Sequence, residues 1–201
     1  MSSLAKPRYT QEEYLALERR ADHRSEFLGG EIFAMAGVSF THNVIVANVV
    51  GELRNRFQGG PCQPVANDQR VRVQATGLNT YPDVAVVCGE PHFMDEDRDT
   101  LLNPTVLVEV LSRSTEAYDR GEKFAHYRWL ESVSDYLLIS QDKVRVEHYV
   151  RQPDGQWLLS ESSGLQERVH LASVDCDLLL SDVYDKVEFP PDTEPPVGAR
   201  I

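Results

Sequence analysis

One carboxylate stands inside an apolar segment near the middle of the chain, and it constrains the fold more than any other feature. Residues 105–111 read Thr-Val-Leu-Val-Glu-Val-Leu, which places Glu109 between two valines. The segment is short, rich in β-branched residues and preceded by Asn103-Pro104, so it predicts a buried strand. Because burying an isolated carboxylate is costly, Glu109 needs a cation, a hydrogen-bonding partner or a shifted pKa.

A second carboxylate, Asp83, follows Pro82 and opens another apolar segment that ends at Gly89. This segment also predicts a strand. Hard cations such as Mg²⁺ take oxygen ligands, often one or two protein carboxylates completed by water and a substrate phosphate. Asp83 and Glu109 therefore predict a divalent-metal site suited to metal-assisted hydrolysis. The two acids alone leave an alternative open, in which Asp83 merely ends a strand and Glu109 pairs with an Arg or Lys elsewhere.

The composition is that of a globular protein, with 201 residues of which 41% are apolar and 26% charged. We expect one domain over residues 1–188 and a disordered tail over the proline-rich residues 189–201. The chain lacks a run of eighteen apolar residues, and its start lacks the apolar core of a signal peptide. These features predict no membrane association and a cytoplasmic location.

Three cysteines, Cys62, Cys88 and Cys176, are widely spaced and form no CxxC or Cys/His cluster. Their number and spacing argue against a disulfide framework and against a structural zinc site. Cys88 ends an apolar segment, so we expect it to be a small core residue.

The net charge of −12 argues against long-range attraction of nucleic acid, since phosphate backbones select basic surfaces. The excess lies after residue 61: residues 1–61 hold seven basic and seven acidic residues, and residues 62–201 hold thirteen and twenty-five. A basic face would draw on Arg19, Arg20, Arg24, Arg54, Arg56, Arg70 and Arg72. The alternative is that these arginines are ordinary solvated residues.

Local patterns predict helices and strands in alternation. Thr10-Gln-Glu-Glu13 is a capping box that opens a helix ending near Arg20. Gly29-Gly30 joins two short apolar segments as a hairpin. Helices are also expected over residues 39–57 and 116–130, and strands over residues 64–74, 81–88, 105–111, 135–140, 144–150 and 156–160. The acidic run 95–99 is expected to be a solvated loop. This order predicts an α/β or α+β domain with a mixed central sheet flanked by helices.

A metal-bound water is often positioned by a nearby cation. A lysine at position 111 would share a strand face with Glu109, but this chain has Leu111 at that position. Lys123 is the substitute that we expect, because Lys123, Tyr127 and Leu130 share one face of the following helix. The alternative is an ordinary i, i+4 ion pair between Lys123 and Asp119.

Two further residues are candidates by their chemical type. Glu26, on the first hairpin strand, could supply another oxygen to a metal, and His42, at the start of the second helix, could assist with protons or bind phosphate. The alternatives are a solvent-exposed Glu26 and a half-buried His42 that serves only packing.

Taken in order, these motifs resemble the Uma-two type restriction endonucleases of the PD-(D/E)xK nuclease superfamily. The matching positions are residues 10–17, 24–31, 35–37, 42, 81–84, 107–112, 114–115, 119, 123, 127 and 135–136. The departure is Leu111, where the superfamily motif has lysine, although members of this family commonly share that departure.

The resemblance implies a restriction-endonuclease-like core and hydrolysis of DNA phosphodiester bonds with Mg²⁺ or Mn²⁺. It implies that Asp83, Glu109 and the backbone carbonyl of Val110 hold the metal, and that Lys123 replaces the motif lysine. Glu26 would be the acidic residue of the N-terminal part. A homodimer would allow both strands of a duplex to be cut. The competing hypothesis is a non-catalytic, homo-oligomeric binding or regulatory protein that retains the nuclease fold, which the strong negative charge favours.

Overall fold

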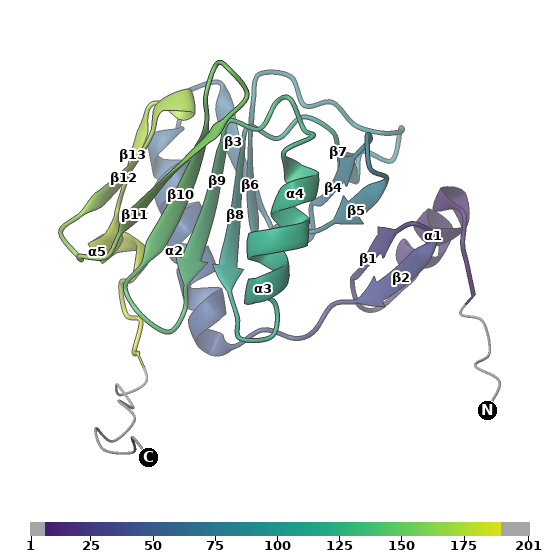
Figure 1. Ribbon diagram of the computed structural model, residues 1–201, viewed down its shortest axis with the longest axis horizontal. Coiled ribbons are helices and arrows are strands. Elements are labelled where there is room, and N and C mark those ends of the chain that lie inside the picture. The colour runs from purple at the N-terminus through teal and green to yellow at the C-terminus, as the bar shows by residue number, and fades with distance from the viewer. Residues whose placement is uncertain (1–6, 190–201) are drawn as a thin grey trace, which may run out of the picture.

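A six-stranded sheet, a five-stranded sheet, a two-stranded sheet of β12 and β13 and several helices make up the protein in a computed structural model, which describes residues 7–189 (Figure 1). The strands are β1 (Ser25–Leu28), β2 (Glu31–Ala34), β3 (Cys62–Ala66), β4 (Arg70–Val73), β5 (Leu78–Thr80), β6 (Val84–Cys88), β7 (Thr100–Leu101), β8 (Val106–Leu111), β9 (Asp135–Ser140), β10 (Val146–Arg151), β11 (Trp157–Ser162), β12 (Arg168–Leu171) and β13 (Cys176–Leu179). The α-helices are α1 (Gln11–Glu18), α2 (Phe40–Arg56), α3 (Glu116–Tyr118), α4 (Phe124–Tyr127) and α5 (Leu180–Val183).

The larger sheet has six strands in the order β11-β10-β9-β8-β6-β3. Strands β8 and β9 are parallel, with α3 and α4 in the connection between them, and the other neighbours are antiparallel. Helix α2 covers one face of this sheet, and α3 and α4 lie on the other (Figure 1). The expected mixed sheet flanked by helices is therefore confirmed.

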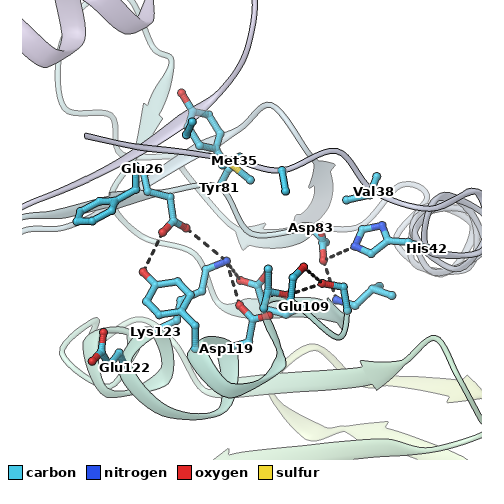
Figure 2. Close-up of a pocket in the computed structure, with 18 of the residues that line it drawn as sticks. Glu26, Met35, Val38, His42, Tyr81, Asp83, Glu109, Asp119, Glu122 and Lys123 are labelled. Atoms are coloured by element: carbon cyan, nitrogen blue, oxygen red, sulfur yellow. Dashed lines mark hydrogen bonds and ion pairs between the residues drawn. The ribbon is translucent and has the colours of Figure 1, made fainter. Parts of the chain in front are cut away.

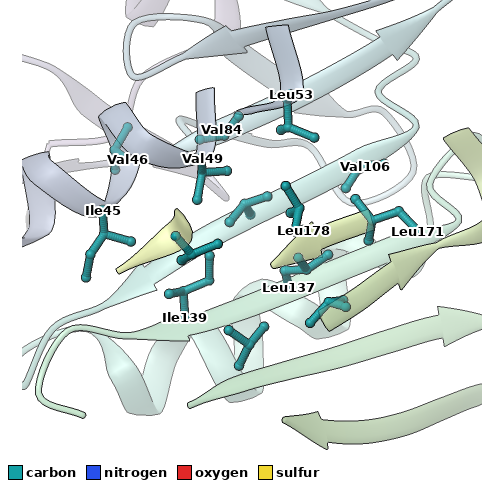
Figure 3. Packing of buried hydrophobic residues seen from close by; sticks show 14 of the residues in the cluster. Ile45, Val46, Val49, Leu53, Val84, Val106, Leu137, Ile139, Leu171 and Leu178 are labelled. Atoms are coloured by element: carbon teal, nitrogen blue, oxygen red, sulfur yellow. The ribbon is translucent and has the colours of Figure 1, made fainter. Parts of the chain in front are cut away.

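Alternation along β8 sends its side chains into two different cores, because successive residues of a strand face opposite sides. Val106, Val108 and Val110 pack with α2 and the hairpin of β12 and β13 (Figure 3). Leu107 and Leu111 pack with Tyr127 and Leu130 in the second core. Glu109 belongs to the second face by its position, so its carboxylate stands on the side of α3 and α4.

The smaller sheet has five strands in the order β2-β1-β5-β4-β7. Helix α1 packs on it through Tyr14 and Leu15, which contact Phe27 of β1. The Thr10 side chain accepts a hydrogen bond from the Glu13 backbone N–H, and the Glu13 side chain accepts one from the Thr10 N–H. The predicted capping box and hairpin are both present, and the hairpin pairs β1, the strand that carries Glu26, with β2.

The expected strand over residues 64–74 is wrong as one element. The chain leaves β3 after Ala66, turns at Asn67, which has a φ of 52°, and enters the other sheet as β4. Asparagine tolerates this left-handed conformation better than most residues do. Sequence patterns also missed β5, β7, β12, β13 and α5, which are at most four residues long.

The expectation of no disulfide is wrong, and so is that of Cys88 as a simple core residue. Cys62 and Cys88 are joined by a disulfide bond, with their Cα atoms 4.0 Å apart. The antiparallel register of β3 and β6 places them directly opposite one another. Because they are 26 residues apart without a motif, only this register reveals the pair. Such pairs are more common outside the cytosol, and the location of the chain stays a prediction.

Within residues 7–189, no helix combines the length and the apolar character that crossing a membrane requires. The predicted tail falls, apart from Phe189, outside the described residues.

Candidate functional site

Asp83 and Glu109 lie at the same end of two adjacent strands. Val84 faces Val108 in the antiparallel register of β6 and β8, so Asp83 comes next to Glu109. Asp83 Oδ2 accepts a hydrogen bond of 2.7 Å from the backbone N–H of Val110. This bond fixes the Asp83 carboxylate beside the strand that carries Glu109 (Figure 2).

Lys123 reaches back from the following helix to the buried Glu109, as the sequence predicts. Its Nζ lies 2.8 Å from Glu109 Oε1 and 3.5 Å from Asp119 Oδ1. Residues Asp119–Lys123 form a π-helical turn between α3 and α4, an irregularity that is frequent at functional sites. The contacts expected from both alternative interpretations are therefore present: Glu109 pairs with Lys123, and Lys123 also pairs with Asp119.

Glu26 enters the same cluster from the hairpin, and its expected alternative as an exposed residue is wrong. Its side chain is only 12% exposed, and its Oε1 lies 3.7 Å from Lys123 Nζ. The Tyr118 hydroxyl donates to its Oε2 at 2.8 Å, and the Thr80 hydroxyl donates to its Oε1. Glu26 thus ties the smaller sheet to the π-helical turn.

His42 contacts Asp83 rather than serving packing alone. Ser39 caps α2, and its side chain accepts from the His42 backbone N–H. The imidazole Nε2 lies 3.1 Å from Asp83 Oδ2. The ring is buried, and its Nδ1 has no hydrogen-bond partner among the described residues. His42 and the Val110 N–H together hold one oxygen of Asp83.

These side chains line a pocket of roughly 470 Å³ between the hairpin, α2 and the π-helical turn. The lining includes five acidic residues, Glu26, Asp83, Glu109, Asp119 and Glu122. Lys123 is the one Lys or Arg in the lining within residues 7–189, and its ammonium pairs with Glu26, Glu109 and Asp119. The cluster is therefore short of positive charge.

The pKa directions follow first from burial and then from the charges in the cluster. Burial raises the pKa of Glu109 well above its usual value, and the Asp119 and Asp83 carboxylates add to the rise against the opposing effect of Lys123. Burial likewise raises the pKa of Asp119. Burial alone would lower the pKa of Lys123, but Glu109, Asp119 and Glu26 raise it well above its usual value. Burial and neighbouring carboxylates thus favour the protonated forms of Glu109 and Asp119, and neighbouring carboxylates favour the charged form of Lys123.

Three of the seven arginines considered for a basic face, Arg19, Arg24 and Arg70, form ion pairs within the chain. Arg19 forms ion pairs of 2.7, 2.7 and 2.8 Å with Asp95, Asp97 and Asp99. Buried Arg70 also contacts Asp99 at 2.8 Å, and Arg24 pairs with Asp68. The acidic loop 95–99 is thus partly exposed, as expected, and its three aspartates also form ion pairs with arginines.

All the predicted site residues, Val110 included, line this one pocket. Sequence reasoning did not assign a role to the tyrosines that support it. The Tyr127 hydroxyl donates to Glu109 Oε1 at 2.9 Å, and the Tyr136 hydroxyl donates to the Asp119 backbone carbonyl at 3.0 Å. The spacing of Lys123 and Tyr127, one helical turn apart, was the signal available for the first of them.

The chain is similar to a family model, to two proteins of Synechocystis sp. and to a crystal structure from Anabaena variabilis. The model of the Uma2 family, described as "putative restriction endonuclease", matches residues 11–180. An uncharacterized protein of Synechocystis sp. is 38% identical over 155 residues, covering 77% of this chain and 88% of its own length. A second uncharacterized Synechocystis protein is 35% identical over 186 residues, covering 91% and 95%.

The crystal structure of a putative nuclease from Anabaena variabilis has the same fold, with a TM-score of 0.72. The match covers 88% of this chain and 97% of that chain at 18% identity, so it bears on the fold alone. The family match extends over most of the described residues, and it includes every candidate site residue. The chain therefore belongs to the Uma2 family of putative restriction endonucleases.

Proposed function

We propose that this chain is a metal-dependent endonuclease that hydrolyses phosphodiester bonds in DNA. The observation that carries the proposal is that Asp83, Glu109 and Lys123, from three separate elements, meet in one pocket with more carboxylate than ammonium. Family membership supports it. A cytoplasmic location and a homodimer are parts of the same proposal.

The donor set fits Mg²⁺ or Mn²⁺. The hydrogen bonds to Asp83 go to Oδ2 and those to Glu109 go to Oε1, which leaves the other oxygen of each for a cation. Residues 7–189 contain no cluster of three or more His, Cys, Asp or Glu side chains arranged for a metal, and hard cations often take only one or two carboxylates. Asp83, Glu109 and the Val110 carbonyl would hold the ion. When bound, it would polarise a phosphate oxygen and make water more acidic.

The chain's own groups hold this arrangement in place. The Lys123 ammonium, fixed by Glu109 and Asp119, would position the attacking water and offset charge that develops on the phosphate. His42 holds the Asp83 carboxylate, and Tyr127 holds that of Glu109. Glu26 restrains Lys123 from the opposite side.

Cleavage of supercoiled plasmid and of single-stranded DNA with Mg²⁺ or Mn²⁺ tests the proposal. We expect Asp83→Ala and Lys123→Ala to lower the cleavage rate at least about a hundredfold, because each removes a group that acts on the transition-state charge. Asp97→Ala, which alters an exposed carboxylate of the acidic loop, is the matched control and should cleave normally. Circular dichroism would check that each variant is folded. Undiminished cleavage by Asp83→Ala would contradict the assignment of the active site to this pocket.

One observation favours the non-catalytic alternative: Arg19 and Arg24, which could have drawn DNA to the surface, are ion-paired within the chain, and Arg70 is buried. That alternative predicts no cleavage by the wild-type protein. It also predicts no rise in melting temperature with millimolar Mg²⁺ or Mn²⁺, since a ligand that binds the folded state must raise it.

A further inference from the structure

A segment without regular structure, residues 35–39, joins β2 to α2 and passes along one side of the pocket, and we call it the strap (Figure 2). Met35 and Val38 of the strap and Phe33 of β2 line the pocket. They are 38%, 52% and 46% exposed. Three large apolar side chains thus remain open to solvent beside a cluster of carboxylates.

The groups proposed for chemistry lie deeper than this apolar rim. Glu109 and Lys123 are buried, and Glu26 is nearly so. Phe33, Met35 and Val38 line the same pocket but are partly exposed, and Figure 2 shows Met35 and Val38 along its strap side. Because the groups proposed for chemistry lie below the rim, a phosphate that reaches them brings its nucleotide into the pocket, which favours a nucleotide that is not held in a base-paired stack.

The charges around the pocket also argue against binding of a duplex. A duplex is bound chiefly through phosphate contacts with Lys and Arg. The pocket lining offers Lys123, which is already committed to three carboxylates. Arg113 beside the strap is paired with Asp142. The rim therefore suits the apolar face of a base better than the backbone of a duplex.

We propose that the pocket takes an unpaired nucleotide of single-stranded DNA, whose base packs against Phe33, Met35 and Val38 while its phosphate reaches Asp83 and Glu109. The inference rests on the proposed function and adds the substrate class. Single strands bind proteins through bases that stack on aromatic and apolar side chains, and this interaction is independent of base identity. The pocket volume of roughly 470 Å³ lies in the range of sites that enclose a small ligand.

Fluorescence anisotropy with a labelled DNA 12-mer, single-stranded or annealed to its complement, tests the inference. The assay contains Ca²⁺, another hard cation that prefers oxygen ligands, so that binding is measured apart from cleavage. We expect the single strand to bind at least about tenfold more tightly than the duplex. We expect Phe33→Ala to weaken single-strand binding about tenfold, in line with the loss of one stacked base. Leu158→Ala, at an exposed apolar position on β11, is the matched control and should bind as the wild type does.

Equal or tighter binding of the duplex would overturn the inference, and so would undiminished single-strand binding by Phe33→Ala. Absence of binding to both forms would overturn it as well. Adding Mg²⁺ then separates the two proposals. Selective binding without cleavage would contradict the endonuclease proposal alone, and cleavage that prefers the duplex would contradict the single-strand inference alone.

Discussion

Two acidic clusters in this protein are built in opposite ways. In the loop 95–99, Asp95, Asp97 and Asp99 face two guanidinium groups, those of Arg19 and Arg70. In the pocket, five acidic residues line the same space as one lysine, Lys123. The loop is partly exposed and nearly neutralised from within the chain, whereas the pocket is buried and keeps an excess of negative charge.

The direction of the pKa shifts separates the clusters. Partial burial would raise the pKa of Asp99, but hydrogen bonds from Arg19 and Arg70 hold it well below its usual range. In the pocket, burial raises the pKa of both Glu109 and Asp119. The aspartates of the loop are compensated by arginine, whereas the pocket is short of positive charge, and two of its carboxylates, Asp83 and Glu109, are the ones we assign to a cation.

Removing a positively charged side chain from each cluster should give the largest difference in stability between the two. We expect Lys123→Ala to lower the free energy of unfolding by about 3–5 kcal/mol, because it leaves buried carboxylates without compensation. Arg19→Ala should cost about 1 kcal/mol, because Arg19 is 31% exposed and water screens its partners. Urea unfolding without divalent metal measures both values.

A double variant shows whether uncompensated negative charge causes the loss of stability in Lys123→Ala. Glu109→Gln in the Lys123→Ala background should restore part of the lost stability, because it removes one of the uncompensated carboxylates. An equal loss for Lys123→Ala and Arg19→Ala would contradict the contrast between the clusters.

A smaller effect is expected from pH. A carboxyl group with a raised pKa in the folded state binds its proton more tightly there than in the unfolded chain. Stability therefore rises as pH falls from the raised pKa of Glu109 toward its ordinary value of 4.5, by at most about 1.4 kcal/mol per pH unit and proton. We expect metal-free wild type to gain stability between pH 7 and pH 5, and Glu109→Gln to gain less.

The contribution of Asp99 in the loop to stability should change with pH in the opposite direction. The pKa of Asp99 is lowered, so its contribution is complete above 3.8 and is lost as pH falls further. Asp99→Asn should therefore leave the gain between pH 7 and pH 5 unchanged. A gain of the same size in Glu109→Gln as in wild type would show that another group carries it.

Much of the site could be predicted from local sequence. The β-branched run around Glu109 and the helical spacing of Lys123 and Tyr127 need only short-range periodicity, which is the strongest signal a sequence carries. The capping box fixed α1 in the same way.

What local patterns missed depends on register and tertiary contacts. Cys62 meets Cys88 because β3 and β6 align in one particular register. Arg19 reaches the acidic loop across 76 or more positions of sequence. The turn at Asn67 divides an apparently continuous strand between two sheets. None of these contacts leaves a periodic trace in the sequence.

Isothermal titration calorimetry with Mn²⁺ is the most direct experiment on the pocket. We predict one binding site in wild type and in Asp97→Asn, the matched loop variant, and loss of that site in Asp83→Asn. Binding should also release protons, because a metal displaces them from carboxyl groups whose pKa is raised. Equal binding by Asp83→Asn, or no binding by the wild-type protein, would contradict the assignment of the undercompensated pocket to a divalent cation.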